Sequence, residues 1–119
     1  MPVQIEAEEK GFLILRISGL VTQEDKKQWE EAVVKAIKCY GKAKALVILE
    51  GFQGWKKTAA WGDLSFFMEY DKKIEKIAFV GDPKWQDEIF AFTGKSLRSA
   101  KIEFFNTSQE PEARSWLSD

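Results

Sequence analysis

Aromatic and basic side chains gather in one stretch of the sequence, 51-GFQGWKKTAAWGDLSF-66, directly after the apolar run 45-ALVIL-49. At the end of a buried strand, indole rings can line a pocket for an apolar or planar molecule, and lysines beside them can meet an acidic group. The same indoles can form the centre of a protein interface, where tryptophan is enriched, or complete the core. The candidate ligand- or partner-binding residues are Phe52, Trp55, Lys56, Lys57, Trp61 and Phe66.

Catalytic side chains are scarce in the sequence. There is no histidine, which is the commonest general base and the commonest metal ligand. The single cysteine, Cys39, excludes a zinc site built from cysteine and histidine, and a thiol near a helix C-terminus is not activated. Nothing converges on Glu6, Glu8 and Glu9, which fit the solvated side of an edge strand. We therefore expect no enzyme, no metal and no cofactor, and a packing role for Cys39.

The glycines of the aromatic stretch do not form a nucleotide-binding loop. Gly51 and Gly54 match neither G-x-x-x-x-G-K-[ST] nor G-x-G-x-x-G. The turn 81-GDP-83 opens a helix whose free N–H groups could receive an anion. Asp82 would occupy these donors as the helix cap, so we expect this turn to be structural.

The totals describe a single small domain, residues 1–119. The chain is 45% hydrophobic and 31% charged, with a net charge of −1. This balance predicts no long-range attraction to nucleic acid or an anionic membrane, and the cluster Lys72, Lys73 and Lys76 is too small to change that. No apolar run is long enough to span a bilayer, and the first residues lack a signal-peptide core. We expect a cytoplasmic protein without a nucleic-acid partner and without membrane insertion.

The strands that must position the candidate residues follow from hydrophobic periodicity. The first two are joined by the turn signal Lys10-Gly11, which predicts an antiparallel hairpin. The third is a continuous apolar run, typical of a strand covered on both faces. The expected strands are 3–9, 12–19, 45–49, 74–81 and 101–106.

Helices are expected between and after these strands. The first begins at Thr22, which with Asp25 forms a capping pair, and ends at Gly41. The second spans 58–70. The apolar face of the first helix is expected to consist of Trp29, Ala32, Val33, Ala36, Ile37 and Tyr40.

Two further helices complete the order β-β-α-β-α-β-α-β-α. The third begins with the cap Asp82 and ends at Gly94. The fourth is capped at Thr107 or Ser108, and Glu110 completes a capping box with Thr107. The third helix is expected to pack through Trp85, Ile89 and Phe92, and the fourth through Ala113, Trp116 and Leu117. The order predicts an α/β layered domain with a mostly parallel five-stranded sheet.

Three stretches give the chain a resemblance to the STAS, or SpoIIAA-like, family. They are 12-FLILRISGLVTQED-25, 77-IAFVGDPKWQDEIFAF-92 and 102-IEFFNTSQEPEARSWL-117. The chain is most similar to the small bacterial SpoIIAA-like proteins, which are also compared with the lipid-binding CRAL-TRIO domain. The resemblance covers essentially the whole chain, and its motifs are structural and not catalytic.

The resemblance implies a non-catalytic, often dimeric module. In the anti-anti-sigma branch such a module binds a partner kinase and is switched by phosphorylation of a serine after the third strand. Here that place reads 49-LEGFQGWKKTAAW-61. Glu50 stands near the place of the family's aspartate, no serine follows, and Thr58 is the nearest hydroxyl. A phosphorylation switch of this kind is therefore not expected.

The function expected from the sequence is a cytoplasmic SpoIIAA-like module that acts through protein contacts as a homodimer. Five tryptophans and nine phenylalanines in 119 residues exceed what a small core readily hides. The alternative is a carrier or sensor of a small apolar or lipid-like ligand. It predicts a cavity between the second helix and the sheet, near Phe52, Trp55, Trp61 and Phe66.

Overall fold

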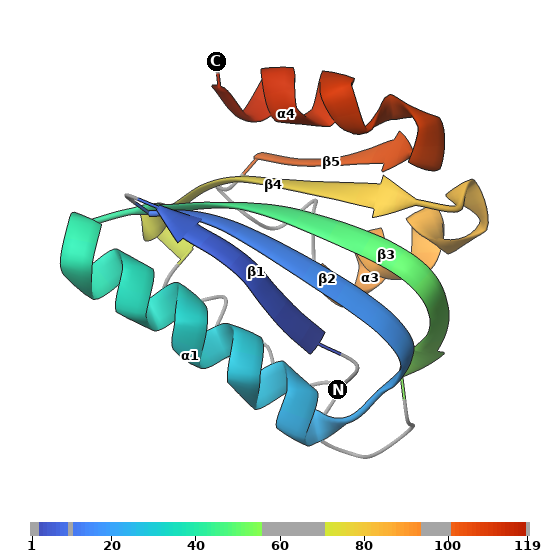
Figure 1. Ribbon diagram of the computed structural model, residues 1–119, viewed down its shortest axis with the longest axis horizontal. Coiled ribbons are helices and arrows are strands. Elements are labelled where there is room, and N and C mark those ends of the chain that lie inside the picture. Colours follow the sequence, from blue (N-terminus) through green and yellow to red (C-terminus); the bar gives the residue numbers. More distant parts are fainter. Residues whose placement is uncertain (1–2, 10, 56–70, 94–100, 119) are drawn as a thin grey trace.

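The computed structural model describes residues 3–9, 11–55, 71–93 and 101–118. Its centre is one five-stranded sheet in the order β1-β2-β3-β4-β5. β1 is antiparallel to β2, and every other neighbouring pair is parallel, as the sequence predicts (Figure 1). The strands are β1 Val3–Glu9, β2 Phe12–Val21, β3 Ala43–Trp55, β4 Ile74–Gly81 and β5 Lys101–Asn106.

The helices cover both faces of this sheet. α1 and α3 pack on one face, whereas α4 lies on the other, above β4 and β5 in Figure 1. The expected second helix, 58–70, lies outside the described residues. The helices described are α1 Gln23–Tyr40, α3 Gln86–Thr93 and α4 Glu110–Ser118, with short 3-10 turns η2 Asp71–Lys73, η3 Pro83–Trp85 and η5 Thr107–Gln109.

Two hydrophobic layers result because β3 and β4 are apolar on both faces. On the α1 side, alternate residues such as Leu15 and Val47 meet Ala36 and Ile37 of α1. On the α4 side, Leu117 is fully buried. Its neighbours in that layer are Leu46, Ile48, Ala78, Val80 and Ala113. The prediction that the third strand is covered on both faces is confirmed.

The first helix begins and ends where the sequence predicts. The side chain of Thr22 accepts a hydrogen bond from the N–H of Asp25, and Asp25 accepts one from the N–H of Thr22 at 2.8 Å. This reciprocal capping box satisfies N–H groups that an unfinished helix end would leave free. Gly41 ends the helix with φ 83°, the left-handed conformation that glycine adopts without strain.

The third strand is longer than predicted. Residues 51–55 were expected in a loop, but β3 continues to Trp55 and pairs with the end of β2 through Gly19↔Phe52 and Val21↔Trp55. The register shifts twice in this region. Gly51 and Gly54 have φ values of 65° and 94°, which residues with a Cβ rarely adopt. The glycines therefore mark irregular strand here, and the prediction that the third strand ends at residue 49 was wrong.

Two residues at the end of α1 are exposed against expectation. Cys39 was predicted to pack, but it is exposed, and Tyr40 is 48% exposed although it continues the apolar spacing of the helix. The last buried side chain of the helix is Ile37. Periodicity gives the direction in which a side chain points, but it does not show where the covering sheet stops.

The cap of the last helical segment also differs from the prediction. Asn106, and not Thr107 or Ser108, caps the 3-10 turn that leads into α4. Its side chain accepts from the N–H of Ser108 at 3.2 Å, and its own N–H donates to Gln109 Oε1 at 2.9 Å. The capping box is thus completed by Gln109 and not by Glu110, because the 3-10 turn starts the helical path before α4 itself begins.

Candidate functional site

The predicted aromatic site begins at the carboxyl ends of the parallel strands, where open α/β sheets bind their ligands. Phe52 and Trp55 lie in the last part of β3, at this edge. Phe52 is only 8% exposed and belongs to the core on the α1 side. The other predicted residues, Lys56, Lys57, Trp61 and Phe66, lie outside the described residues, as does Thr58.

Trp85 is the aromatic side chain that the structure adds to this site. It comes from η3, after the neighbouring strand β4, and its ring meets Phe52 edge-on with centroids 4.8 Å apart and planes at 64°. Such a pair contributes about 1 kcal/mol beyond area burial. The sequence analysis placed Trp85 on the apolar face of the third helix. It packs against the same core as Ile89, as predicted, but it is half-buried and lies in η3, directly before α3 begins.

The indole of Trp85 also covers a glycine. An added Cβ on Gly54 would lie 3.5 Å from Cη2 of the indole, which is ordinary contact distance. The indole therefore lies over the backbone of β3 at Gly54, at a distance that would place it in contact with an alanine side chain. A sequence signal for this contact exists: a glycine two residues after an aromatic on one strand, and a Gly-Asp-Pro turn ending in tryptophan on the next.

Charged groups frame the exposed part of Trp85. Asp82 caps η3 by accepting from the N–H of Lys84 at 3.0 Å, which confirms its predicted structural role. The ammonium of Lys84 lies 5.7 Å from the centroid of the Trp85 ring, within cation–π range. Leu20, 45% exposed, lies near the end of β2 at the same edge. We call Phe52, Gly54, Lys84 and Trp85 the carboxyl-edge surface.

A ladder of charges crosses the sheet on the face opposite α1. Arg16 of β2 donates hydrogen bonds to Glu6 of β1 on one side and to Glu50 of β3 on the other. The hydrogen bond from Arg16 lowers the pKa of Glu6, and the hydrogen bond to Glu6 contributes most to raising the pKa of Arg16. Glu50, near the place of the family's aspartate, is thus held in an ion pair.

This ladder has little catalytic potential. A carboxylate with a lowered pKa is a weak base near neutral pH. The described residues contain no group of three or more cysteine, aspartate or glutamate side chains that could hold a metal ion. The exposed Glu6 fits its predicted place on the solvated side of the edge strand β1.

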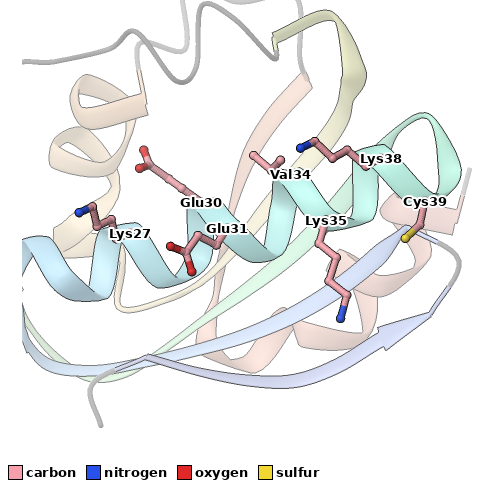
Figure 2. Close-up of a pocket in the computed structure, with 7 residues that line it drawn as sticks. All are labelled: Lys27, Glu30, Glu31, Val34, Lys35, Lys38 and Cys39. Atoms are coloured by element: carbon pink, nitrogen blue, oxygen red, sulfur yellow. The ribbon is translucent and has the colours of Figure 1, made fainter.

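A groove of about 550 Å³ follows the outer face of α1 (Figure 2). Long lysine and glutamate side chains form most of its walls, and the surface that they present to the groove is mainly apolar. Figure 2 also shows Cys39 near one end, beside Lys38. The lining residues are Lys27, Glu30, Glu31, Val34, Lys35, Lys38 and Cys39. This groove lies on α1, away from the predicted ligand site around Phe52.

Comparisons with known proteins identify the sequence pattern and the fold. A model of the SpoIIAA-like family matches residues 12–118. A search among curated proteins finds no match. Among the helices that the structure describes, none combines the length and apolar character needed to cross a bilayer.

Solved structures with similar folds cover nearly the whole chain. An uncharacterised protein of the DUF3478 family with a SpoIIAA-like fold, from Shewanella loihica PV-4, has a TM-score of 0.70 and 22% identity, over 97% of this chain and 91% of that one. The anti-sigma factor antagonist SpoIIAA in its unphosphorylated form has a TM-score of 0.62 and 11% identity, over 96% and 97%. The Bacillus cell fate determinant SpoIIAA in its phosphorylated form has a TM-score of 0.54 and 15% identity, over the same shares. These similarities show the fold.

Proposed function

Because this chain belongs to the SpoIIAA-like family, we propose that it is a non-catalytic cytoplasmic module that acts through protein contacts, beginning with a second copy of itself. The solved SpoIIAA proteins of this fold include an anti-sigma factor antagonist, whose name describes action on another regulatory protein. This supports an interaction role for the present chain.

The observation that carries the proposal is the seating of Trp85. Its indole is fixed by Phe52 and Gly54 but stays half-buried, so a large rigid ring remains partly available at the edge of the sheet. Fixed tryptophans surrounded by polar groups are typical of interface hot spots, because little conformational entropy is lost when they are covered. Lys84 supplies a polar rim beside the ring.

The chain lacks the features on which a phosphorylation switch depends, so we assign the interaction to the carboxyl-edge surface itself. The stretch 49–61 at the end of the third strand contains no serine that such a switch could modify, and Glu50 is paired with Arg16. We therefore propose constitutive contacts, governed by protein concentration and not by modification of a serine after β3.

Native mass spectrometry and light scattering, read as a function of protein concentration, test this proposal. The wild type is expected to dimerise, and Trp85→Ala and Lys84→Glu are expected to weaken the dimer by tenfold or more, the scale of about 1.4 kcal/mol. Lys84→Glu serves as the second variant because the exposed Lys84 can change without a loss of packing. Lys101→Glu, an identical charge change at the opposite end of the sheet, is the matched control.

Three results would overturn the proposal. A wild type that stays monomeric at every concentration contradicts self-association. A dimer that Lys84→Glu and Trp85→Ala leave intact places the contact elsewhere. A persistent small-molecule adduct on the wild type that Trp85→Ala removes would favour the carrier function instead.

A further inference from the structure

Three lysines form a row across neighbouring strands at the amino ends of the parallel sheet. Lys44 of β3 pairs in register with Lys76 of β4, and Lys76 pairs with Lys101 of β5. Like charges directly opposite one another destabilise a sheet, so this row needs a compensating partner. Lys44 and Lys76 have one, because each donates a hydrogen bond of 2.8 Å to a carbonyl in the last turn of α4. Lys101 is exposed and has none among the described residues.

More lysines surround this row. Lys72 and Lys73 form the exposed turn that leads into β4, and Lys42 precedes β3 with its side chain 68% exposed. Glu75 contacts Lys42 at 2.8 Å, and the hydrogen bond from Lys42 lowers the pKa of Glu75. We call the whole group the amino-end lysine patch: Lys38, Lys42, Lys44, Lys72, Lys73, Lys76 and Lys101.

The opposite end of the molecule is acidic. All described α-helices begin at the carboxyl ends of the strands, and α1 and α4 end near the starts of β3 and β4 (Figure 1). Their first turns carry exposed carboxylates, which complement the helix dipole. These are Glu24, Asp87, Glu88 and Glu112. The net charge of −1 is thus the sum of two ends of opposite sign.

Helix dipoles account for the acidic end but not for the lysine patch. Only Lys38 lies in the last turn of an α-helix. Lys72, Lys73 and Lys101 are exposed, lie outside α-helices, and form no hydrogen bond or ion pair with the described residues. Glu75 of β4 contacts Lys42 at 2.8 Å and Lys44 at 3.9 Å, so it offsets part of the positive charge of the patch. The exposed ammonium groups of Lys72, Lys73 and Lys101 are therefore available to a partner.

The kind of cation indicates the kind of partner. Among the residues that the structure describes, this patch contains no arginine, which is the residue enriched in protein interfaces and suited to bidentate phosphate recognition, whereas lysine is depleted from interfaces. The ammonium group of lysine is a hydrated point charge. It attracts, from a distance, a surface that carries many mobile negative charges. Tyr40, 48% exposed beside Lys42, adds an amphipathic ring of the kind found at bilayer interfaces.

We propose that the amino-end lysine patch docks the protein on the anionic surface of a phospholipid bilayer, without insertion. The acidic end is repelled by the same surface, so the carboxyl-edge surface with Trp85 faces away from the membrane. Each lysine near an anionic leaflet raises the partition coefficient about fivefold. The attachment is therefore weak, reversible and sensitive to salt, and it is independent of the protein contacts proposed above.

Flotation with vesicles tests this docking. Phosphatidylcholine vesicles with and without phosphatidylglycerol are mixed with the full chain at low ionic strength and again at high salt. The variant Lys72→Gln/Lys73→Gln removes two exposed charges without a hydrogen-bond partner among the described residues. The control Lys27→Gln/Lys35→Gln has the same net charge but removes two exposed lysines of α1 that lie outside the patch.

We expect the wild type to float only with vesicles that contain phosphatidylglycerol. Binding of Lys72→Gln/Lys73→Gln should be about 30-fold weaker, and that of the control should be unchanged. Equal weakening of both variants, or no flotation of the folded wild type, overturns the proposal. Displacement from vesicles by a DNA duplex at a lower phosphate concentration assigns the patch to nucleic acid and also overturns it. A monomeric wild type that floats leaves this inference standing while the proposed self-association fails.

Discussion

Lys44 and Lys76 stand opposite one another on β3 and β4, and their ammonium groups donate to successive carbonyls of α4, those of Leu117 and Trp116. Helix ends leave carbonyl groups unsatisfied and carry a partial negative charge. The repulsion between the two ammonium groups is therefore offset, because both donate hydrogen bonds to the same helix end. The sheet and its last helix are joined electrostatically as well as by apolar packing.

The variant Lys76→Met tests this connection. It removes the hydrogen bond to Trp116 and the ammonium that lies 5.1 Å from the Trp116 ring centroid. The free energy of unfolding should fall by about 1 kcal/mol, measured by urea denaturation. The control Lys101→Met changes the same row at an exposed position and should alter stability by less than about 0.5 kcal/mol. Equal losses would show that the hydrogen bond contributes nothing.

Leu117 anchors α4 to the sheet. It is fully buried among residues of β3 and β4, so Leu117→Ala removes apolar contacts and leaves a cavity. We expect a loss of about 3 kcal/mol in the free energy of unfolding. The neighbouring exposed Ser118 offers the control Ser118→Ala, which should cost far less. A small loss for Leu117→Ala would mean that α4 contributes little to the core.

The Arg16 ladder predicts a pH dependence. The pKa of Glu6 is lowered from its ordinary value of 4.5 by the hydrogen bond from Arg16. The unfolded state then binds more protons in this range, so the contribution is complete above pH 4.5 and is lost as pH falls through the lowered pKa. Arg16→Gln should flatten this decline in urea denaturation at a series of pH values.

Carboxyl NMR gives a direct reading of the same effect. The titration midpoint of Glu6 should return toward 4.5 in Arg16→Gln. Lys42→Gln is the control, because it removes the partner that lowers the pKa of Glu75 and should leave Glu6 unchanged. A midpoint of Glu6 at 4.5 in the wild type would contradict the ladder.

Alanine variants at Gly54 and Gly41 distinguish the effect of backbone strain from the effect of the indole contact. Both have positive φ, 94° and 83°, so alanine at either position should cost about 1 kcal/mol in urea denaturation. Only Gly54→Ala places a Cβ against Trp85, whereas nothing lies within 4 Å at Gly41. The indole N–H signal of Trp85 in NMR spectra should therefore shift in Gly54→Ala and stay in place in Gly41→Ala. Identical spectra would disprove the seating of the ring.

The sequence predicted the order of elements because apolar spacing and caps are local signals. Thr22, Asp25 and Asp82 are caps in the structure as they are in the sequence. The end of β3 was missed because glycine indicates a loop and an irregular strand equally well, and only pairing with Gly19 and Val21 decides between them. The contact of Trp85 with Phe52 was missed because it joins η3 to β3, two elements that are far apart in the chain.

The lysine patch was hidden from the sequence for a topological reason. Lys44, Lys76 and Lys101 are far apart in the chain, so a total of charge over the whole sequence does not reveal them. Only the parallel order of β3, β4 and β5 brings them into one row. The candidate ligand residues Lys56, Lys57, Trp61 and Phe66 remain predictions of the sequence.

The separation of acid and base along the strands has a practical consequence in chromatography. Column retention depends on the local charge that faces a resin, and the sum over the whole molecule matters less. Lysines lie at one end, and the carboxylates of Glu24, Asp87 and Glu88 lie toward the other. A cation exchanger can therefore bind the lysine end and an anion exchanger the acidic end. Near its isoelectric point of about 5.6, the protein should be retained by both cation and anion exchangers at low salt.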